Sequence, residues 1–200
     1  MKNNKLVYLG LSADSIHHGH MKLLEKARGL GDVMIGLLTD KAVAETKRLP
    51  YLNYDQRKKI LQNFKGVKKI VPQQENDYSH NIKKYKPDFM IHGDDWKKGY
   101  ESNFRKNCIK ELKKYGGKLI EIPYTKGISS ASLVNHLNQI SITPDIRRSL
   151  LRRLINSKKI SRFLETHSPI SAIIAENVIF KDQNTTKSFD GFWSSSLTDA

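Results

Sequence analysis

Short apolar runs recur along the first two thirds of the chain, separated by longer stretches of mixed character. Most of these runs have the length and the aliphatic content of a strand, and polar residues, glycine or proline stand at their ends. The predicted strands are residues 5–9, 33–38, 67–71, 89–91 and 119–122. Pro72 follows the third run, and we expect it to end that strand.

The stretches between these runs place apolar residues at helical spacing, with capping residues at their ends. Asn53 is a good N-cap, and glycines follow several of the patterns as stop signals. The predicted helices span residues 20–28, 53–64, 81–85, 101–115 and 129–137.

Alternating strands and helices joined by short turns predict an α/β fold, with right-handed crossovers. We expect a Rossmann-like, five-stranded parallel sheet with helices on both faces. Four polar clusters follow strands, and the carboxyl ends of parallel strands form the usual ligand site of such a sheet. The clusters read LSADSIHHGH, TDKAVAETKR, HGDDW and PYTKGISS. Their positions predict one binding site at that edge.

The character of the chain changes near residues 138–143. Thr143-Pro144 is a good helix start, and apolar residues at helical spacing follow it. The basic residues of this stretch are Arg147, Arg148, Arg152, Arg153, Lys158, Lys159 and Arg162, against Asp145 alone. We interpret this run as a solvated helix face. The predicted division is a domain at 1–140, a basic helical linker at 141–160 and a further segment at 161–200.

The bulk composition narrows the class of protein. The 200-residue chain has a net charge of +15, which favours acidic partners such as small polyphosphates or nucleic acid. No run approaches the ~18 apolar residues of a membrane span. A single cysteine, Cys108, predicts no disulfide and a cytoplasmic location. Zinc is disfavoured because the histidines near position 18 have no cysteine close by.

The histidine cluster after the first strand suits phosphate chemistry. A helix N-terminus supplies free backbone N–H groups and a partial positive charge. Gly19 allows a phosphate to approach the backbone, and His17 and His20 can donate hydrogen bonds to phosphate oxygens in a transition state. The pattern therefore predicts a phosphate site with these two histidines as catalytic residues.

Residues 14–20, read as DSIHHGH, resemble the D-x-x-H-x-G-H signature of nucleotidyltransferases related to glycerol-3-phosphate and ethanolamine-phosphate cytidylyltransferases. Three further segments resemble the family in the same order: YDQRK at 54–58, HGDDW at 92–96 and TKGISS at 125–130. The resemblance covers residues 5–138. It departs from the family at Tyr124, where an arginine is common, and at Lys126, where glutamate is common, so the group that binds cytosine stays open.

The resemblance implies a role for each matching residue. His17 and His20 would stabilise the α-phosphorus of CTP, Lys47 would touch the phosphates, and Arg57 would hold the polyphosphate or the acceptor's acidic group. The implied nucleotide-binding residues are Leu11, Ser12, Ala13, Asp14, Gly19, His92, Gly93, Asp95, Thr125, Gly127, Ile128, Ser129 and Ser130. The implied acceptor-binding residues are Arg48, Asp94, Trp96 and Tyr124. The resemblance also implies a homodimer and Mg²⁺ held on the phosphates, with no metal ligand from the protein.

The last forty residues resemble a different family. The stretches 164–172 and 189–199 resemble the opening of phosphoenolpyruvate mutase, a barrel of the isocitrate-lyase superfamily. We expect a truncated piece of a fused cytidylyltransferase–mutase chain, without mutase activity, in which residues 181–200 are mobile or borrow a partner's surface.

The fusion implies a phosphonate acceptor. The first expectation is 2-aminoethylphosphonate, with 2-hydroxyethylphosphonate, phosphocholine and glycerol 3-phosphate as alternatives. Asp94, Asp95 and Trp96 would receive its ammonium group through charge and cation–π contact.

Two other classes of function remain open. An adenylyltransferase of the same fold is disfavoured because residues 128–133 lack the arginine that usually follows this segment. A basic nucleic-acid-binding module is favoured by charge alone, since no binding motif or interleaved aromatic residues accompany it.

Overall fold

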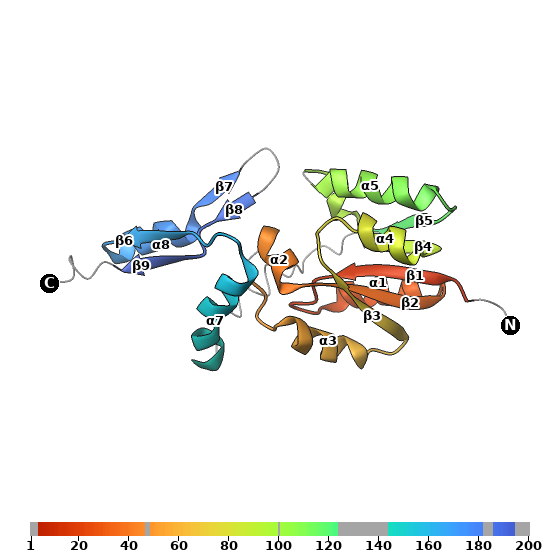
Figure 1. Cartoon of the computed structure of the whole chain (residues 1–200), viewed down its shortest axis with the longest axis horizontal. Coiled ribbons are helices and arrows are strands. Elements are labelled where there is room, and N and C mark those ends of the chain that lie inside the picture. Colours follow the sequence, from red (N-terminus) through yellow and green to blue (C-terminus); the bar gives the residue numbers. More distant parts are fainter. Residues whose placement is uncertain (1–3, 47–48, 100, 124–143, 182–185, 195–200) are drawn as a thin grey trace.

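The domain core is a five-stranded, fully parallel sheet. The structure is a computed structural model that describes residues 4–46, 49–99, 101–123, 144–181 and 186–194. The strands are β1 (Leu6–Leu11), β2 (Asp32–Leu38), β3 (Val67–Gln73), β4 (Phe89–Gly93) and β5 (Lys118–Ile122). Their order is β3-β2-β1-β4-β5 (Figure 1). The predicted α/β fold with a Rossmann-like sheet is confirmed.

Helices cover both faces of this sheet because successive side chains of a strand point to opposite sides. Leu9 of β1 packs in the cluster that holds Leu24 and Leu61, from the helices on one face. Its neighbour Tyr8 packs with Ile82 and Leu112 on the other face. The first pair of helices is α1 (His18–Arg28) and α3 (Tyr54–Gln62); the second is α4 (Ser79–Tyr85) and α5 (Glu101–Lys113).

The order of the strands reverses at β1, which lies between β2 and β4. Leu9 is in register with Ile35 on one side and with Ile91 on the other. The chain segments that leave β1 and β4 therefore begin next to each other, at the carboxyl edge of the sheet. Such a reversal is where open α/β sheets bind ligands.

Two details of the predicted elements were wrong. The third strand does not end at Pro72 but continues to Gln73, because β3 is an edge strand and needs no proline N–H on its open side. A short helix, α2 (Asp40–Thr46), follows β2 where only a polar cluster was expected. Thr39 caps it, its Oγ1 accepting from the N–H of Ala42 at 3.2 Å. The helix predicted over 129–137 lies outside the described residues.

The basic helix begins at the predicted proline. It is α7 (Pro144–Ser157), and it packs against α2 (Figure 1). Leu154 is buried in a small cluster with Ala44 and Leu49. The helix is therefore attached to the sheet domain beside the end of β2.

The C-terminal elements form a separate pairing. β6 (Phe163–Thr166) pairs in parallel with β9 (Gly191–Ser194), and α8 (Pro169–Asn177) packs against both. β7 (Ile179–Lys181) and β8 (Thr186–Ser188) are antiparallel. Within the described residues, β8 pairs with β7 and β9 pairs with β6, while the expectation that residues 181–200 are mobile or borrow a partner's surface stays a prediction.

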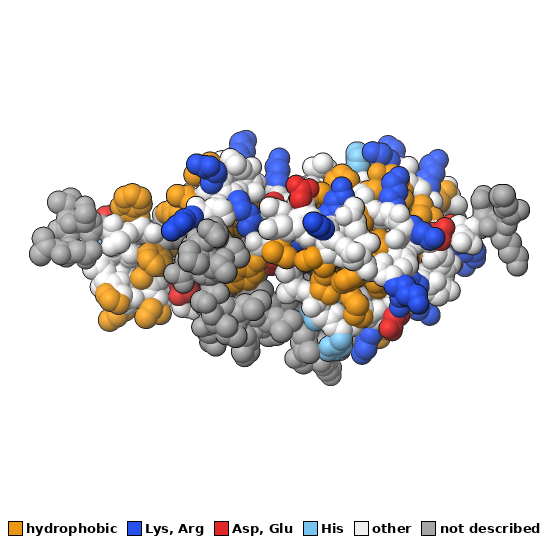
Figure 2. Space-filling model, turned by 90° about the horizontal axis from the view of Figure 1, so that it is seen from below, with side chains coloured by type: hydrophobic (Ala, Val, Ile, Leu, Met, Phe, Trp, Pro, Cys, Tyr) orange, Lys and Arg blue, Asp and Glu red, His pale blue; other side chains and the backbone are white. Residues whose placement is uncertain are grey.

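Apolar side chains are exposed at this end of the molecule (Figure 2). They include Ile170, Ile173 and Trp193, the last with 69% of its surface exposed. Among the helices that the structure describes, none has the length and apolar character needed to cross a bilayer.

Candidate active site

The side chains of His17 and His20 cap the first helix. His17 is the N-cap of α1, and its Nδ1 accepts a hydrogen bond from the backbone N–H of Gly19 at 3.1 Å. His20 accepts through its own Nδ1 from the backbone N–H of His17 at 3.3 Å. This reciprocal arrangement is a capping box, with histidines in the places more often taken by serine and glutamate.

The capping contacts fix the tautomer of both rings. Because Nδ1 accepts in each, the neutral imidazole carries its proton on Nε2. The two ring centroids lie 4.0 Å apart, and both side chains are half-buried. The start of α1 therefore combines a pair of imidazole N–H donors with the positive end of a helix dipole, and no acidic residue occupies its first turn.

The surroundings of His17 favour its neutral form. Burial lowers the pKa of His17 below its usual value of 6.5, and the neighbouring His18 lowers it further. Protonation of Nδ1 would also remove the acceptor that caps Gly19. The ring can thus serve as a neutral hydrogen-bond donor through its Nε2.

The turn between β1 and α1 is conformationally strained, and hydrogen bonds from residues distant in the sequence hold it in place. Ala13 is buried with φ of 54°, in the left-handed region that costs an L-residue about 1 kcal/mol. The carboxylate of Asp14 accepts from the backbone N–H of Tyr51 at 2.7 Å. The carbonyl of Ser12 accepts from Arg57. Leu11 is buried in the core, so only its backbone can reach a nucleotide.

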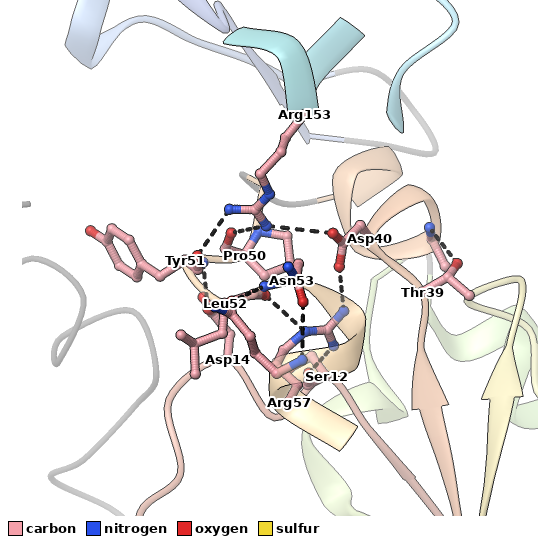
Figure 3. A network of polar contacts seen from close by, with 12 residues as sticks. Ser12, Asp14, Thr39, Asp40, Pro50, Tyr51, Leu52, Asn53, Arg57 and Arg153 are labelled. Carbon is pink, nitrogen blue, oxygen red and sulfur yellow. Dashed lines mark hydrogen bonds and ion pairs between the residues drawn. The ribbon is translucent and has the colours of Figure 1, made fainter. Parts of the chain in front are cut away.

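Arg57 is fully buried and donates to protein groups, as Figure 3 shows. Its Nε donates to the carbonyl of Leu52 at 3.1 Å, and its Nη1 donates to the carbonyl of Ser12. Its Nη2 pairs with Asp40 at 2.6 Å. The sequence assigned Arg57 to direct contact with the polyphosphate or the acceptor. The structure gives it a different position, in which it fixes the turn before the histidines.

The chain leaving β4 forms the facing part of the site. His92 stacks on Trp96 with 3.8 Å between ring centroids and 14° between planes. Its Nδ1 donates to the carbonyl of Gly93 at 2.8 Å, which leaves Nε2 as the acceptor of the neutral ring. Burial lowers the pKa of His92, which favours that neutral form.

Trp96 is a core residue, which leaves little of its ring surface for the predicted cation–π contact with an acceptor. Its side chain is 1% exposed, with His92 against one face and Tyr78 edge-on at 6.0 Å. Its Nε1 donates to Glu121 at 2.9 Å. The letters G-D-D-W do not reveal which side chain turns inward. Asp94 and Asp95 lie in the same short 3-10 helix, η1 (Asp94–Lys97), and their side chains are 33% and 52% exposed.

The sequence did not single out Glu121 or Arg105. The Nε and Nη2 of Arg105 each donate to the Glu121 carboxylate at 2.9 Å, in a bidentate pair. The hydrogen bonds from Arg105 hold the pKa of Glu121 below its usual value, against the opposing effect of burial. Glu121 thus anchors Trp96 and, through it, the η1 segment. The one feature of the sequence that could have indicated Glu121 is its position near the carboxyl end of the fifth predicted strand.

Several predicted site residues lie outside the described part of the chain. They are Lys47, Arg48, Tyr124, Thr125, Gly127, Ile128, Ser129 and Ser130. Of the described ones, the structure brings together His17, Gly19 and His20 at one helix end. His92–Asp95 lie at the carboxyl end of β4, the strand that neighbours β1, and so at the same edge of the sheet.

The resemblance implies a magnesium ion held by the phosphates of the nucleotide, and this stays a prediction. Within the described residues, no group of three or more histidine, cysteine or acidic side chains is arranged to bind a metal. Asp14 is engaged by Tyr51, and Asp94 lies 3.7 Å from Lys97. Such an ion would offset charge on the polyphosphate oxygens.

The fold and this helix-end pair of histidines are those expected of a nucleotidyltransferase. The chain belongs to the cytidylyltransferase-like family, whose pattern matches residues 8–136. It is 34% identical over 122 residues to glycerol-3-phosphate cytidylyltransferase of Bacillus spizizenii, covering 60% of this chain and 87% of that one. It is 30% identical over 126 residues to ethanolamine-phosphate cytidylyltransferase of Mus musculus, covering 62% of this chain and 30% of that one.

The fold also resembles a solved structure, the lipopolysaccharide core biosynthesis protein from Thermoplasma volcanium GSS1. The TM-score is 0.50 at 20% identity, over 63% of this chain and all of that one. This likeness concerns the fold alone.

Proposed function

We propose that the protein transfers CMP from CTP to an acceptor that carries a phosphate or phosphonate group, with release of pyrophosphate. The observation that carries the proposal is the pair of capped imidazoles at the N-terminus of α1, beside the strand-order reversal. The family and its relatives named above support cytidylyl transfer to a phosphate-bearing head group.

The proposed reaction is an in-line displacement. An oxyanion of the acceptor forms a bond to the α-phosphorus of CTP, and the bond from that phosphorus to the bridging oxygen breaks. Such an oxyanion is already ionised near neutral pH, so no strong general base is required. The Nε2–H groups of His17 and His20 donate to oxygens that gain charge in the transition state. The helix N-terminus adds backbone donors and a favourable dipole.

We further propose a phosphonate as the acceptor, with 2-aminoethylphosphonate first. The support is the resemblance of residues 164–172 and 189–199 to the opening of a phosphoenolpyruvate mutase, an enzyme that makes carbon–phosphorus bonds. The parallel β6–α8–β9 arrangement is compatible with the first unit of such a barrel. The half-exposed carboxylate of Asp95 is available to an ammonium group.

A pyrophosphate-release assay tests both steps. The nucleotide panel is CTP, ATP, UTP and GTP; the acceptor panel is 2-aminoethylphosphonate, 2-hydroxyethylphosphonate, phosphocholine and glycerol 3-phosphate. We expect turnover with CTP that falls by about 100-fold or more in His17→Ala and His20→Ala. A strong preference for ATP would refute CMP transfer and show that the protein transfers AMP. A strong preference for glycerol 3-phosphate would refute the phosphonate assignment and leave cytidylyl transfer intact.

A further inference from the structure

Arg153 of α7 makes three hydrogen bonds to the sheet domain, although it belongs to a basic run that the sequence assigned to solvent. Its Nη1 donates to the carbonyl of Tyr51 at 2.9 Å. Its Nη2 donates to the carbonyl of Pro50 at 2.8 Å and lies 3.4 Å from the carboxylate of Asp40. Its side chain is 18% exposed. The neighbouring Arg152, on the same helix, is exposed.

These contacts reach the turn before His17 by two routes. In the first, Tyr51 accepts from Arg153 through its carbonyl and donates through its N–H to the carboxylate of Asp14, at 2.7 Å. The turn residue Asp14 is therefore linked to the guanidinium of Arg153 through a single residue, Tyr51.

The second route runs through Asp40. One carboxylate oxygen of Asp40 faces Arg153, and the other pairs with Nη2 of Arg57 at 2.6 Å. Arg57 in turn donates to the carbonyl of Ser12, on the other side of the strained Ala13. The two routes meet at residues 12–14. Together they form a closed ring of hydrogen bonds and ion pairs, which Figure 3 shows.

On the strength of this ring, and resting on the proposed function, we infer that Arg153 is a positioning residue for the nucleotide site. It holds the β1–α1 turn, and with it the His17–His20 pair, in the geometry that the reaction needs. The left-handed Ala13 supplies the reason that outside support is required, because such a backbone persists only where its surroundings over-determine it. The α7 helix lies beyond the residues that match the family, so this support is supplied from outside the matched segment.

The experiment compares Arg153→Ala, Arg153→Lys and the control Arg152→Ala in the full chain, well below the melting temperature of each. Arg152→Ala removes the same charge from the same helix. We expect Arg153→Ala to lower kcat/KM for CTP by roughly 10- to 100-fold, because small misplacements of catalytic groups have effects of that size. Arg153→Lys keeps the charge but reaches fewer acceptors, and we expect a partial recovery. A kcat/KM for Arg153→Ala within twofold of Arg152→Ala overturns the inference, whatever happens to stability.

A second readout needs no activity. Amide hydrogen exchange at Tyr51, whose N–H is bonded to Asp14, is expected to speed up by at least about fivefold in Arg153→Ala, but not in Arg152→Ala. Equal exchange in the two variants overturns the inference. Absence of turnover by the wild type with every substrate pair would instead refute the proposed function, and the exchange result would then decide the positioning role alone.

Discussion

The Nδ1 atom of His20 accepts a hydrogen bond from the backbone N–H of His17, with 3.3 Å between the two nitrogens. Residues three apart at a helix start are placed for such a contact, which explains why the two histidines of H-x-G-H have this spacing. The same contact sets the proton on Nε2 of His20. Helix capping and phosphate chemistry therefore use the same side chains, and a substitution there changes both unless it is chosen to separate them.

The substitutions His17→Asn and His17→Ala separate the two roles. Asparagine can accept from Gly19 as an N-cap but offers no imidazole donor, whereas alanine offers neither. We expect both variants to lose activity, while only His17→Ala loses about 1 kcal/mol of unfolding free energy. Urea denaturation and the pyrophosphate assay measure the two effects. Equal activity in His17→Asn and the wild type would refute the donor role.

The titration of His17 gives a dependence on pH with a defined sign. Burial, and then His18, lower the pKa of His17 below 6.5 in the folded protein. Between that folded pKa and 6.5, the unfolded chain therefore binds more protons than the folded protein. The contribution of this group to stability is present above pH 6.5 and is lost as pH falls through the folded pKa. NMR titration of the ring measures the value directly, and CTP is expected to raise it. A midpoint at or above 6.5 in the free protein would contradict the structure.

Replacement of Arg57 distinguishes its buried position from the direct substrate contact expected from sequence. Arg57→Met leaves the Asp40 carboxylate and the carbonyls of Ser12 and Leu52 without this partner. We expect a loss of about 3 kcal/mol or more of unfolding free energy, since breaking a buried ion pair has effects of that size. Lys59→Met, exposed on the same helix, serves as the control and should change stability by less than about 0.5 kcal/mol. If Arg57→Met were as stable as the parent but had a raised KM for the acceptor, the direct contact with substrate expected from sequence would be supported instead.

The sheet and most of its helices were predictable because their signals are local. Apolar runs marked most strands of the domain, and Asn53 caps α3 as expected, its side chain accepting from the N–H of Gln56. The seven-residue α2 was missed because it is too short for a periodic pattern, although Thr39 offered a capping signal.

The parts of the site that sequence did not reveal depend on contacts distant along the chain. Arg153 reaches Tyr51 across 102 residues, and nothing in a basic helix tells which arginine turns toward the domain. Trp96 is buried by His92 and Tyr78, which a motif of five letters does not contain. A motif identifies which residue types the chemistry needs, whereas packing decides which of them face the ligand.

The anchoring of Trp96 by Glu121 can be followed by fluorescence. The chain has two tryptophans, so a Trp193→Phe background leaves Trp96 as the sole reporter. In that background, Glu121→Ala removes the acceptor of Nε1 and the partner of Arg105, and we expect red-shifted emission and a loss of about 1–3 kcal/mol. Glu121→Gln keeps an acceptor for Trp96 but loses the charge, so its emission should stay close to the parent while stability falls.

Because Arg105 lowers the pKa of Glu121, the stabilisation is present above the usual carboxyl range and is lost as pH falls through the folded value. Unchanged emission in Glu121→Ala would show that the aromatic stack alone holds Trp96, and the carboxylate would then have no part in placing Asp94 and Asp95.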